Sequence, residues 1–234
     1  MSIQKTITPI DNSVYLERPL STQNEIDNVI DNSKKNFQSW KSTSIDDRIK
    51  IINKFIDNLI ALKPEVSKEI CWQIGRPISQ CGNELRGFEE RSRHMVEIAN
   101  ESLRDIPATK NDEFDNYIYK SPLGVIFVMA PWNYPIITAT NTIVPALLAG
   151  NTIVIKHSSQ TPRCAELISQ AFENTGLPEG VFQFVHTDHQ ACEKIIADPR
   201  IAHVVFTGSV RGGQEVKKYI GTRFINAGLE SVSY

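Results

Sequence analysis

The sequence predicts an α/β fold: a Rossmann-like, doubly wound parallel sheet of about five strands, with an amino-terminal helical region and a short exposed hairpin arm. Three patterns predict it. Apolar residues recur at helical spacing before residue 105, alternate with polar ones at 106–122, and form short β-branched runs between helical stretches at 123–230. Strand–helix–strand repetition indicates parallel strands with right-handed crossovers and helices on both faces.

Composition narrows the class of protein. A chain of 234 residues is long enough for one large domain with an ample core. The net charge of -2, with no basic block in either half, argues against binding to nucleic acid or an anionic membrane. No apolar run approaches the roughly 20 residues that cross a bilayer, and the start lacks the features of a secretory signal. We therefore expect a cytoplasmic protein that binds neither nucleic acid nor membrane.

The four cysteines show neither CxxC spacing nor a histidine at metal-ligand spacing, so the sequence predicts no metal site. Their expected role is that of small buried hydrophobic residues. Cys192 comes closest to a reactive thiol, because Asp188 could cap a helix whose first turn contains it. Burial is much the favoured alternative for Cys192.

Residues 1–105 form the predicted helical part, and the first hundred residues are all expected to be helices and their connections. Ser44 and Asp47 resemble a capping box, and apolar residues follow at helical spacing from Ile45 to Ile60. A second stripe runs from Ile78 to Ala99, for which packing on the chain's own core is favoured over pairing with a partner helix.

The segment 106–122 is the predicted arm. Its side chains would alternate between two faces, Phe114, Asn116, Ile118 and Lys120 on one and Asp115, Tyr117 and Tyr119 on the other. Such alternation is typical of an exposed strand or hairpin.

The segment 123–230 is the predicted sheet. Its strands are expected at Gly124–Ala130, Thr152–Lys156, Val181–His186, His203–Thr207 and Phe224–Leu229. Helix starts are indicated by Thr161-Pro162, Asp188 and Ser209.

The stretch Met129–Pro135 is the most informative of the chain. It follows an apolar strand and presents the carboxamide of Asn133 between two prolines and two aromatic rings. Ligands bind at the carboxyl ends of strands in open α/β sheets. A fixed side-chain amide at such a point can donate a hydrogen bond to an oxygen that gains negative charge.

Further candidate site residues follow later strands. Lys156 could bond ribose hydroxyls, although a surface lysine is the favoured alternative when it is taken alone. Gly208 and Ser209 pass from strand to helix, which suits a pyrophosphate but is common at such turns. Glu230 could act as a general base if partly desolvated, or be a solvated acid.

Taken together and in this order, these motifs indicate a protein family. The chain resembles the aldehyde dehydrogenase superfamily, specifically its amino-terminal, cofactor-binding half. The resemblance rests on Pro131-Trp132-Asn133-Tyr134-Pro135, Lys156 with Gln160-Thr161-Pro162, Gly176-Leu177-Pro178-Glu179-Gly180-Val181, Phe206-Thr207-Gly208-Ser209 and Gly228-Leu229-Glu230.

The resemblance implies a role for each site residue. Asn133 would donate to the oxyanion formed when a catalytic cysteine attacks an aldehyde, and Glu230 would activate the water that hydrolyses the thioester, with burial bringing its pKa near working pH. The remaining positions would bind NAD or NADP: Met129, Pro131 and Trp132 line the cofactor channel, Lys156 contacts the ribose, and Phe206, Gly208 and Ser209 approach the pyrophosphate and ribose. The resemblance also implies an aldehyde substrate and a homo-oligomer, with 106–122 as an oligomerisation-type arm.

Two departures from the family pattern qualify these roles. Members that prefer NAD often carry glutamate where this chain has Ser159, and a hydroxyl does not repel a 2′-phosphate, so we expect NADP to be tolerated or preferred. After Glu230 the family continues with Leu-Gly-Gly-Lys and a catalytic domain bearing the nucleophilic cysteine, whereas this chain has the tail 231–234.

We therefore expect the catalytic domain to be absent and the chain alone to be inactive. The alternatives are a non-catalytic nucleotide-binding module or pseudoenzyme that pairs with full-length subunits, and a fragment that binds nothing well. Arg86, Arg93 and His94 could approach an acidic aldehyde, but solvated surface charge is the favoured role for them.

Overall fold

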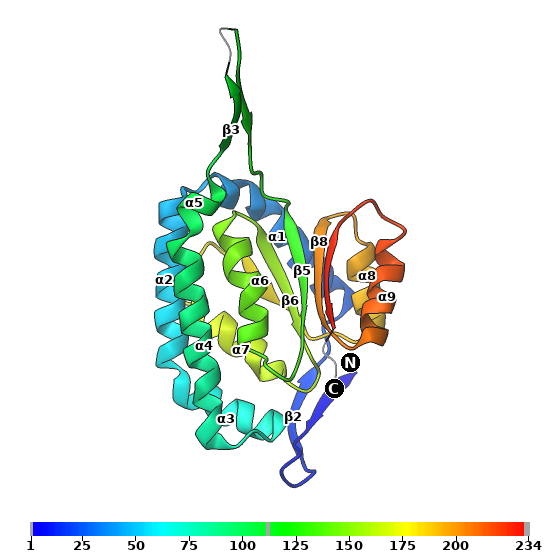
Figure 1. The fold of residues 1–234 in the computed structure, drawn as a ribbon. Coiled ribbons are helices and arrows are strands. Elements are labelled where there is room, and N and C mark those ends of the chain that lie inside the picture. Colours follow the sequence, from blue (N-terminus) through cyan, green and yellow to red (C-terminus); the bar gives the residue numbers. More distant parts are fainter. Residues whose placement is uncertain (1, 111–112, 232–234) are drawn as a thin grey trace.

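A computed structural model describes residues 2–110 and 113–231, and it confirms the predicted α/β class. In these residues the main sheet has five parallel strands in the order β7-β6-β5-β8-β9 (Figure 1). Its strands are β5 (Val125–Ala130), β6 (Thr152–His157), β7 (Phe182–Phe184), β8 (Ile201–Gly208) and β9 (Ala227–Ser231). The chain runs outward from β5 to β7 and then returns to the other side of β5, as a doubly wound sheet does.

Helices cover both faces of the sheet. One face carries the even-numbered side chains of β5, which pack with α2 (Ile45–Ala61), α3 (Lys63–Ile74), α4 (Ile78–Glu97), α6 (Ile137–Leu148) and α7 (Pro162–Phe172). The odd-numbered side chains of β5 pack with α1 (Gln23–Ser42), α8 (His189–Ala197) and α9 (Val210–Ile220). Every residue of β5 is buried, because side chains of a strand alternate between two covered faces.

The predicted helix starts are confirmed. Ser44 accepts a hydrogen bond from the Asp47 backbone N–H at the start of α2. Asp188 and Ser209 do the same for the first turns of α8 and α9, and Thr161 precedes α7. The stripe from Ile78 forms α4 and the short α5 (Ala99–Leu103), and it packs on the chain's own core.

The expectation that the first hundred residues are all helical is wrong for the amino terminus. Residues 3–19 form an antiparallel hairpin, β1 (Ile3–Ile7) and β2 (Val14–Pro19), which lies beside the carboxyl ends of the main sheet (Figure 1). Its strands pair through their backbones and through a Lys5–Glu17 ion pair of 2.9 Å. Most of its side chains are exposed, so no apolar periodicity announced it.

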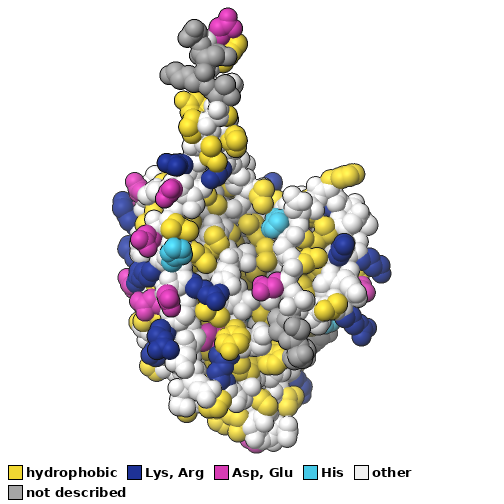
Figure 2. All heavy atoms as spheres, viewed as in Figure 1, with side chains coloured by type: hydrophobic (Ala, Val, Ile, Leu, Met, Phe, Trp, Pro, Cys, Tyr) yellow, Lys and Arg dark blue, Asp and Glu magenta, His cyan; other side chains and the backbone are white. Residues whose placement is uncertain are grey.

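The arm is confirmed as a second antiparallel hairpin, β3 (Ile106–Lys110) and β4 (Asp115–Ile118). It projects from the end of the molecule opposite β1 and β2 (Figure 1). Hydrophobic side chains gather along it (Figure 2), and Tyr117, Ile118 and Tyr119 are 56–72% exposed. The tip at 111–112 lies outside the described residues.

Each strand overlaps its predicted range, and the ends that differ do so by one to three residues. β7 is shorter than Val181–His186, β8 is longer than His203–Thr207, and β9 begins at Ala227 rather than at Phe224. The Phe224 side chain is fully exposed in the connection before β9. The preference of phenylalanine for strands depends on packing against neighbours, and Phe224 has no such packing, so it does not extend β9. Of the predicted tail, Ser231 ends β9 and 232–234 lie outside the described residues.

Candidate active site

A cavity of about 830 Å³ lies where the central strands end. β5 and β8 are neighbours whose connections leave in opposite directions, and this is the point where open α/β sheets bind ligands. The cavity extends between these strand ends and helices α8 and α9. Eight of the predicted site residues line it, namely Met129, Pro131, Trp132, Asn133, Lys156, Phe206, Gly208 and Ser209.

The Asn133 loop is held in place by its neighbours. The Asn133 Oδ1 atom accepts a hydrogen bond of 3.0 Å from the Tyr134 backbone N–H, which leaves the Nδ2 amino group as the donor of this side chain. The Arg76 guanidinium donates to the Asn133 backbone oxygen and lies 4.5 Å from the centre of the Tyr134 ring. The loop is therefore held on both sides of the Asn133 side chain, with the Arg76 guanidinium bound to the Asn133 backbone and stacked on Tyr134.

The buried carboxylate of Glu84 also helps to hold the Asn133 loop. Glu84 on α4 is fully buried, forms an ion pair with Arg76, and accepts hydrogen bonds of 2.7 and 3.2 Å from the backbone N–H groups of Ile136 and Ile137. These N–H groups belong to the start of α6, where a carboxylate is favoured. Burial raises the pKa of Glu84, against the effect of these hydrogen bonds and of Arg76.

Arg76 and Glu84 were missed by the sequence interpretation. The available signal was a glutamate within the apolar stripe of Cys81, Leu85 and Phe88, since a charged residue on the core face of a helix must be paired.

The end of β6 places two adjacent side chains on opposite faces of the sheet. Lys156 lines the cavity, whereas His157 is buried on the other face, and its ring nitrogens have no hydrogen-bond partner among the described residues. Burial, with smaller contributions from the charges of Lys156 and His186, lowers the pKa of His157 to about 3. The ring is therefore neutral at neutral pH.

In the turn after β6, the neighbours Ser158 and Ser159 differ in whether they line the cavity. Ser158 lines the cavity, but Ser159 is exposed and does not. The Ser159 backbone oxygen accepts hydrogen bonds from Gln4 and Thr6 of β1. Of the predicted cofactor-binding residues, Ser159 is thus the one that does not line this cavity.

The strand-to-helix turn at 206–212 brings the backbone close to the cavity. The Ser209 Oγ atom accepts a hydrogen bond of 3.1 Å from the Gly212 N–H. The Phe206 ring lies over both neighbouring glycines, so that a Cβ atom on Gly208 or Gly212 would come within 2.6 Å of Phe206 Cζ. These positions need glycine for a close approach.

Glu230 does not line the large cavity. It lines a smaller cavity of about 250 Å³ beside α9, and Phe206 and Ser209 line both cavities. Glu230 is exposed on the edge strand β9, and Thr207 Oγ1 approaches its carboxylate at 3.5 Å. The desolvation expected for a general base is not present in the described residues.

The cysteines and Arg93, which the sequence also offered as candidates, lie in surroundings that fit a structural role. Burial raises the pKa of the Cys81, Cys164 and Cys192 thiols, which opposes a thiolate nucleophile at any of the three. Arg93 is bonded to Asn53 at 2.7 Å and paired with Asp57, as expected for surface charge.

Within residues 2–110 and 113–231, no group of three or more histidine, cysteine or acidic side chains could hold a metal ion. None of the helices there is long and apolar enough to cross a membrane.

The doubly wound sheet and the cavity at its switch point define a Rossmann-like domain with a site of the kind that binds dinucleotides. The sequence model described as "Aldehyde dehydrogenase family" matches residues 2–232. The chain therefore belongs to the aldehyde dehydrogenase family.

Individual relatives agree with this assignment. The chain is 29% identical over 234 residues to succinate semialdehyde dehydrogenase [NAD(P)+] of Escherichia coli strain K12, covering 96% of this chain and 50% of that protein. It is 30% identical over 227 residues to succinate-semialdehyde dehydrogenase [NADP(+)] 1 of Mycobacterium tuberculosis strain H37Rv, with the same coverage. The chain thus spans about half the length of these relatives.

A solved structure gives the same result for the fold. The crystal structure of an aldehyde dehydrogenase from Bartonella henselae superposes with a TM-score of 0.91 at 26% identity, covering 98% of this chain and 48% of that one.

Proposed function

We propose that this chain is the cofactor-binding half of an aldehyde dehydrogenase, an oxidoreductase that converts an aldehyde to a carboxylic acid with NAD+ or NADP+. The observation that carries the proposal is the cavity at the β5/β8 switch point, which collects eight of the predicted residues. Its volume of about 830 Å³ lies within the range of small-molecule sites. The names of the relatives include both cofactors.

The cavity fits a dinucleotide chemically. Met129 and Val216 provide apolar wall, and Lys156 and Arg211 provide cations for hydroxyl and phosphate oxygens. Gly208 has no Cβ atom, which leaves room for the Phe206 ring to lie over the backbone at the cavity wall. When bound, the nicotinamide ring would supply a hydride acceptor.

Asn133 and Glu230 have separate roles in the proposal. The Asn133 Nδ2 amino group would donate to the oxyanion that forms when a thiolate adds to the aldehyde. The Glu230 carboxylate would take a proton from the water that hydrolyses the thioester, which requires partial desolvation of this exposed group. The proposal assigns the thiolate to the half of the relatives' length that these 234 residues do not span.

Ser159 decides the expected cofactor preference. A carboxylate at this position would repel a 2′-phosphate, whereas the Ser159 hydroxyl can donate to one. We therefore propose that NADP+ is tolerated or preferred. Calorimetric titration of the chain with NAD+ and NADP+ tests this, and tenfold tighter binding of NAD+ contradicts it.

The matched variants are Ser159→Glu and Ser159→Ala. We expect the glutamate to weaken NADP+ binding about tenfold or more and to leave NAD+ binding equal or stronger. The alanine should change either affinity by less than about fivefold, because it removes one hydrogen bond and adds no charge.

A second candidate is a nucleotide-binding module without catalysis, which could pair with full-length subunits through the exposed arm. The burial of Cys81, Cys164 and Cys192 favours it for the chain alone. Incubation with an aldehyde and NAD(P)+ separates the candidates, because formation of reduced cofactor requires a reactive thiol. We expect none from this chain, and turnover would overturn that expectation.

A further inference from the structure

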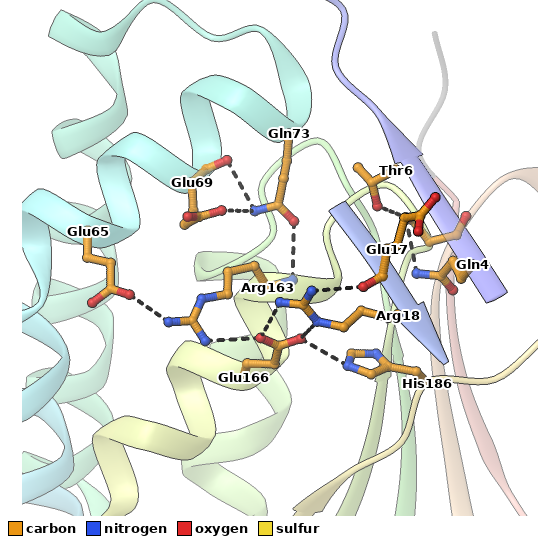
Figure 3. Close-up of polar contacts among 11 residues, drawn as sticks. Gln4, Thr6, Glu17, Arg18, Glu65, Glu69, Gln73, Arg163, Glu166 and His186 are labelled. Carbon is orange, nitrogen blue, oxygen red and sulfur yellow. Dashed lines mark hydrogen bonds and ion pairs between the residues drawn. The ribbon is translucent and has the colours of Figure 1, made fainter. Parts of the chain in front are cut away.

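The amino-terminal hairpin reaches the turn that follows β6. From β1, Thr6 Oγ1 donates a hydrogen bond of 2.8 Å to the Ser159 backbone oxygen, and Gln4 Nε2 donates one of 3.3 Å to the same atom (Figure 3). In the opposite direction, Gln160 Nε2 donates to the Ile7 backbone oxygen at 2.8 Å. Thr6 is buried, so its hydroxyl is committed to this contact.

The same turn is attached to the cavity side of the molecule. The Ser158 N–H donates to the Ala130 oxygen at 3.0 Å, and the Thr161 N–H donates to the Ser158 oxygen at 2.9 Å. Ser158 lines the cavity. The turn is therefore held between β5 on one side and β1 on the other.

The hairpin is itself firmly attached elsewhere. Arg18 on β2 bonds both oxygens of Glu166 on α7, at 2.6 and 3.0 Å, and Glu166 also accepts from Arg163 and contacts His186 (Figure 3). Burial tends to raise the pKa of Glu166, but these hydrogen bonds together hold it well below its usual range. A hairpin attached through an ionised, half-buried cluster can act as a rigid support for the turn.

We propose that the β1–β2 hairpin is a component of the nucleotide site, with Gln4 and Thr6 as positioning residues. They fix the Ser159 carbonyl and so set where Ser158 and Ser159 meet the ribose and its 2′-substituent. This inference rests on the proposed function. The contribution to affinity is preorganisation, because a turn already fixed in place loses less conformational entropy when the ligand binds.

The experiment compares the unmodified chain with the double variant Gln4→Ala/Thr6→Val by calorimetric titration with NADP+ and NAD+. Valine keeps the volume of Thr6 and removes its hydroxyl. We expect NADP+ affinity to fall about fivefold and NAD+ affinity to fall by less than about twofold, because the proposed function assigns Ser159 to the 2′-substituent, which only NADP+ carries as a phosphate. A general loss of stability would lower both affinities alike.

Two controls separate positioning from folding. Thr6→Ser keeps the donor and should bind NADP+ as the unmodified chain does. Tyr15→Phe removes the 3.1 Å hydrogen bond from β2 to Glu69 but leaves the turn untouched, and it should change neither affinity.

Each other outcome has a definite meaning. Unchanged NADP+ binding by the double variant overturns the inference and leaves the proposed function standing. An equal loss of binding in Tyr15→Phe also overturns the inference. Failure of the unmodified chain to bind either nucleotide overturns the proposed function and the inference with it.

Discussion

The interior and edge strands of the sheet end in different ways, although both carry a predicted catalytic residue. After β5, Asn133 is held by Arg76 and, through α6, by the buried Glu84. At the end of β9, Glu230 is exposed and has one long contact of 3.5 Å with Thr207. Interior strands have elements on both sides that can fix a loop, whereas an edge strand has only one neighbour.

Under the proposed roles, the two residues need different support. An oxyanion donor must be in position before the reaction, because the energy of reorienting it would otherwise add to the barrier. A general base needs desolvation, which an exposed edge does not give. The described residues therefore hold the Asn133 loop in place but leave the Glu230 carboxylate exposed.

The largest expected effect tests the contacts that support the Asn133 loop after the interior strand β5. Glu84→Ala removes a buried carboxylate and leaves Arg76 and the N–H groups of Ile136 and Ile137 without their acceptor. We expect the free energy of unfolding to fall by about 3–5 kcal/mol. Denaturant unfolding measures it.

The control lies on the same helix. Glu89 is 3.9 Å from Arg93, with both side chains more than a third exposed, so Glu89→Ala should cost less than about 1 kcal/mol. Equal losses in the two variants would show that the Glu84 attachment contributes nothing beyond helix propensity.

The second prediction concerns the pH dependence of the interior strand β6. The pKa of His157 is about 3 in the fold and about 6.5 when unfolded, so only the unfolded chain binds a proton between these values. The stability that depends on neutral His157 is complete above about pH 6.5 and is lost as pH falls toward 3. Between about pH 6 and 5 we expect a loss of about 1 kcal/mol per pH unit.

His157→Leu should remove this part of the slope, since leucine does not titrate. His94→Leu is the matched control for the histidine-to-leucine change itself, because the His94 side chain is exposed. A smaller slope in His157→Leu than in His94→Leu supports the prediction. Identical slopes for the unmodified chain and His157→Leu would rule out a buried neutral imidazole at this position.

The sequence predicted the parts of this molecule that depend on local pattern. The parallel sheet, the caps at Asp188 and Ser209, and the strand-end position of Asn133 all follow from periodicity and side-chain chemistry. The support of Asn133 by Arg76 and Glu84 did not, because it joins residues about fifty positions apart, a separation that periodicity does not report.

The hairpin β1–β2 was missed for a related reason. Its strands are short and largely exposed, so neither an apolar stripe nor a buried run marks them. What holds the hairpin in place is polar and non-local, from Thr6 to Ser159 and from Arg18 to Glu166. Such contacts depend on tertiary geometry, which a single sequence does not display.

A third prediction concerns β8, the interior strand next to the edge. Gly208→Ala places a Cβ atom 2.6 Å from Phe206 Cζ and forces the ring to move within the cavity. We expect about fivefold weaker NADP+ binding, equivalent to about 1 kcal/mol of overpacking. Gly213→Ala is the control, because its Cβ would lie 3.7 Å from the same ring, an ordinary contact. Similar losses in both variants would indicate that helix α9, rather than the ring, sets the affinity.

The smallest effect is expected for Glu230 on the edge strand β9. Glu230→Gln keeps the shape of the side chain and removes its charge, and among the described residues it alters the 3.5 Å hydrogen bond from Thr207 Oγ1. We expect the free energy of unfolding to change by less than about 0.5 kcal/mol, and NADP+ binding to stay within about twofold. Denaturant unfolding and calorimetric titration measure the two quantities. A loss above about 2 kcal/mol would mean that Glu230 is held as tightly as Asn133, and the contrast between interior and edge strands would then fail. A small change supports the contrast, because it shows that the described residues do not hold the Glu230 side chain in place.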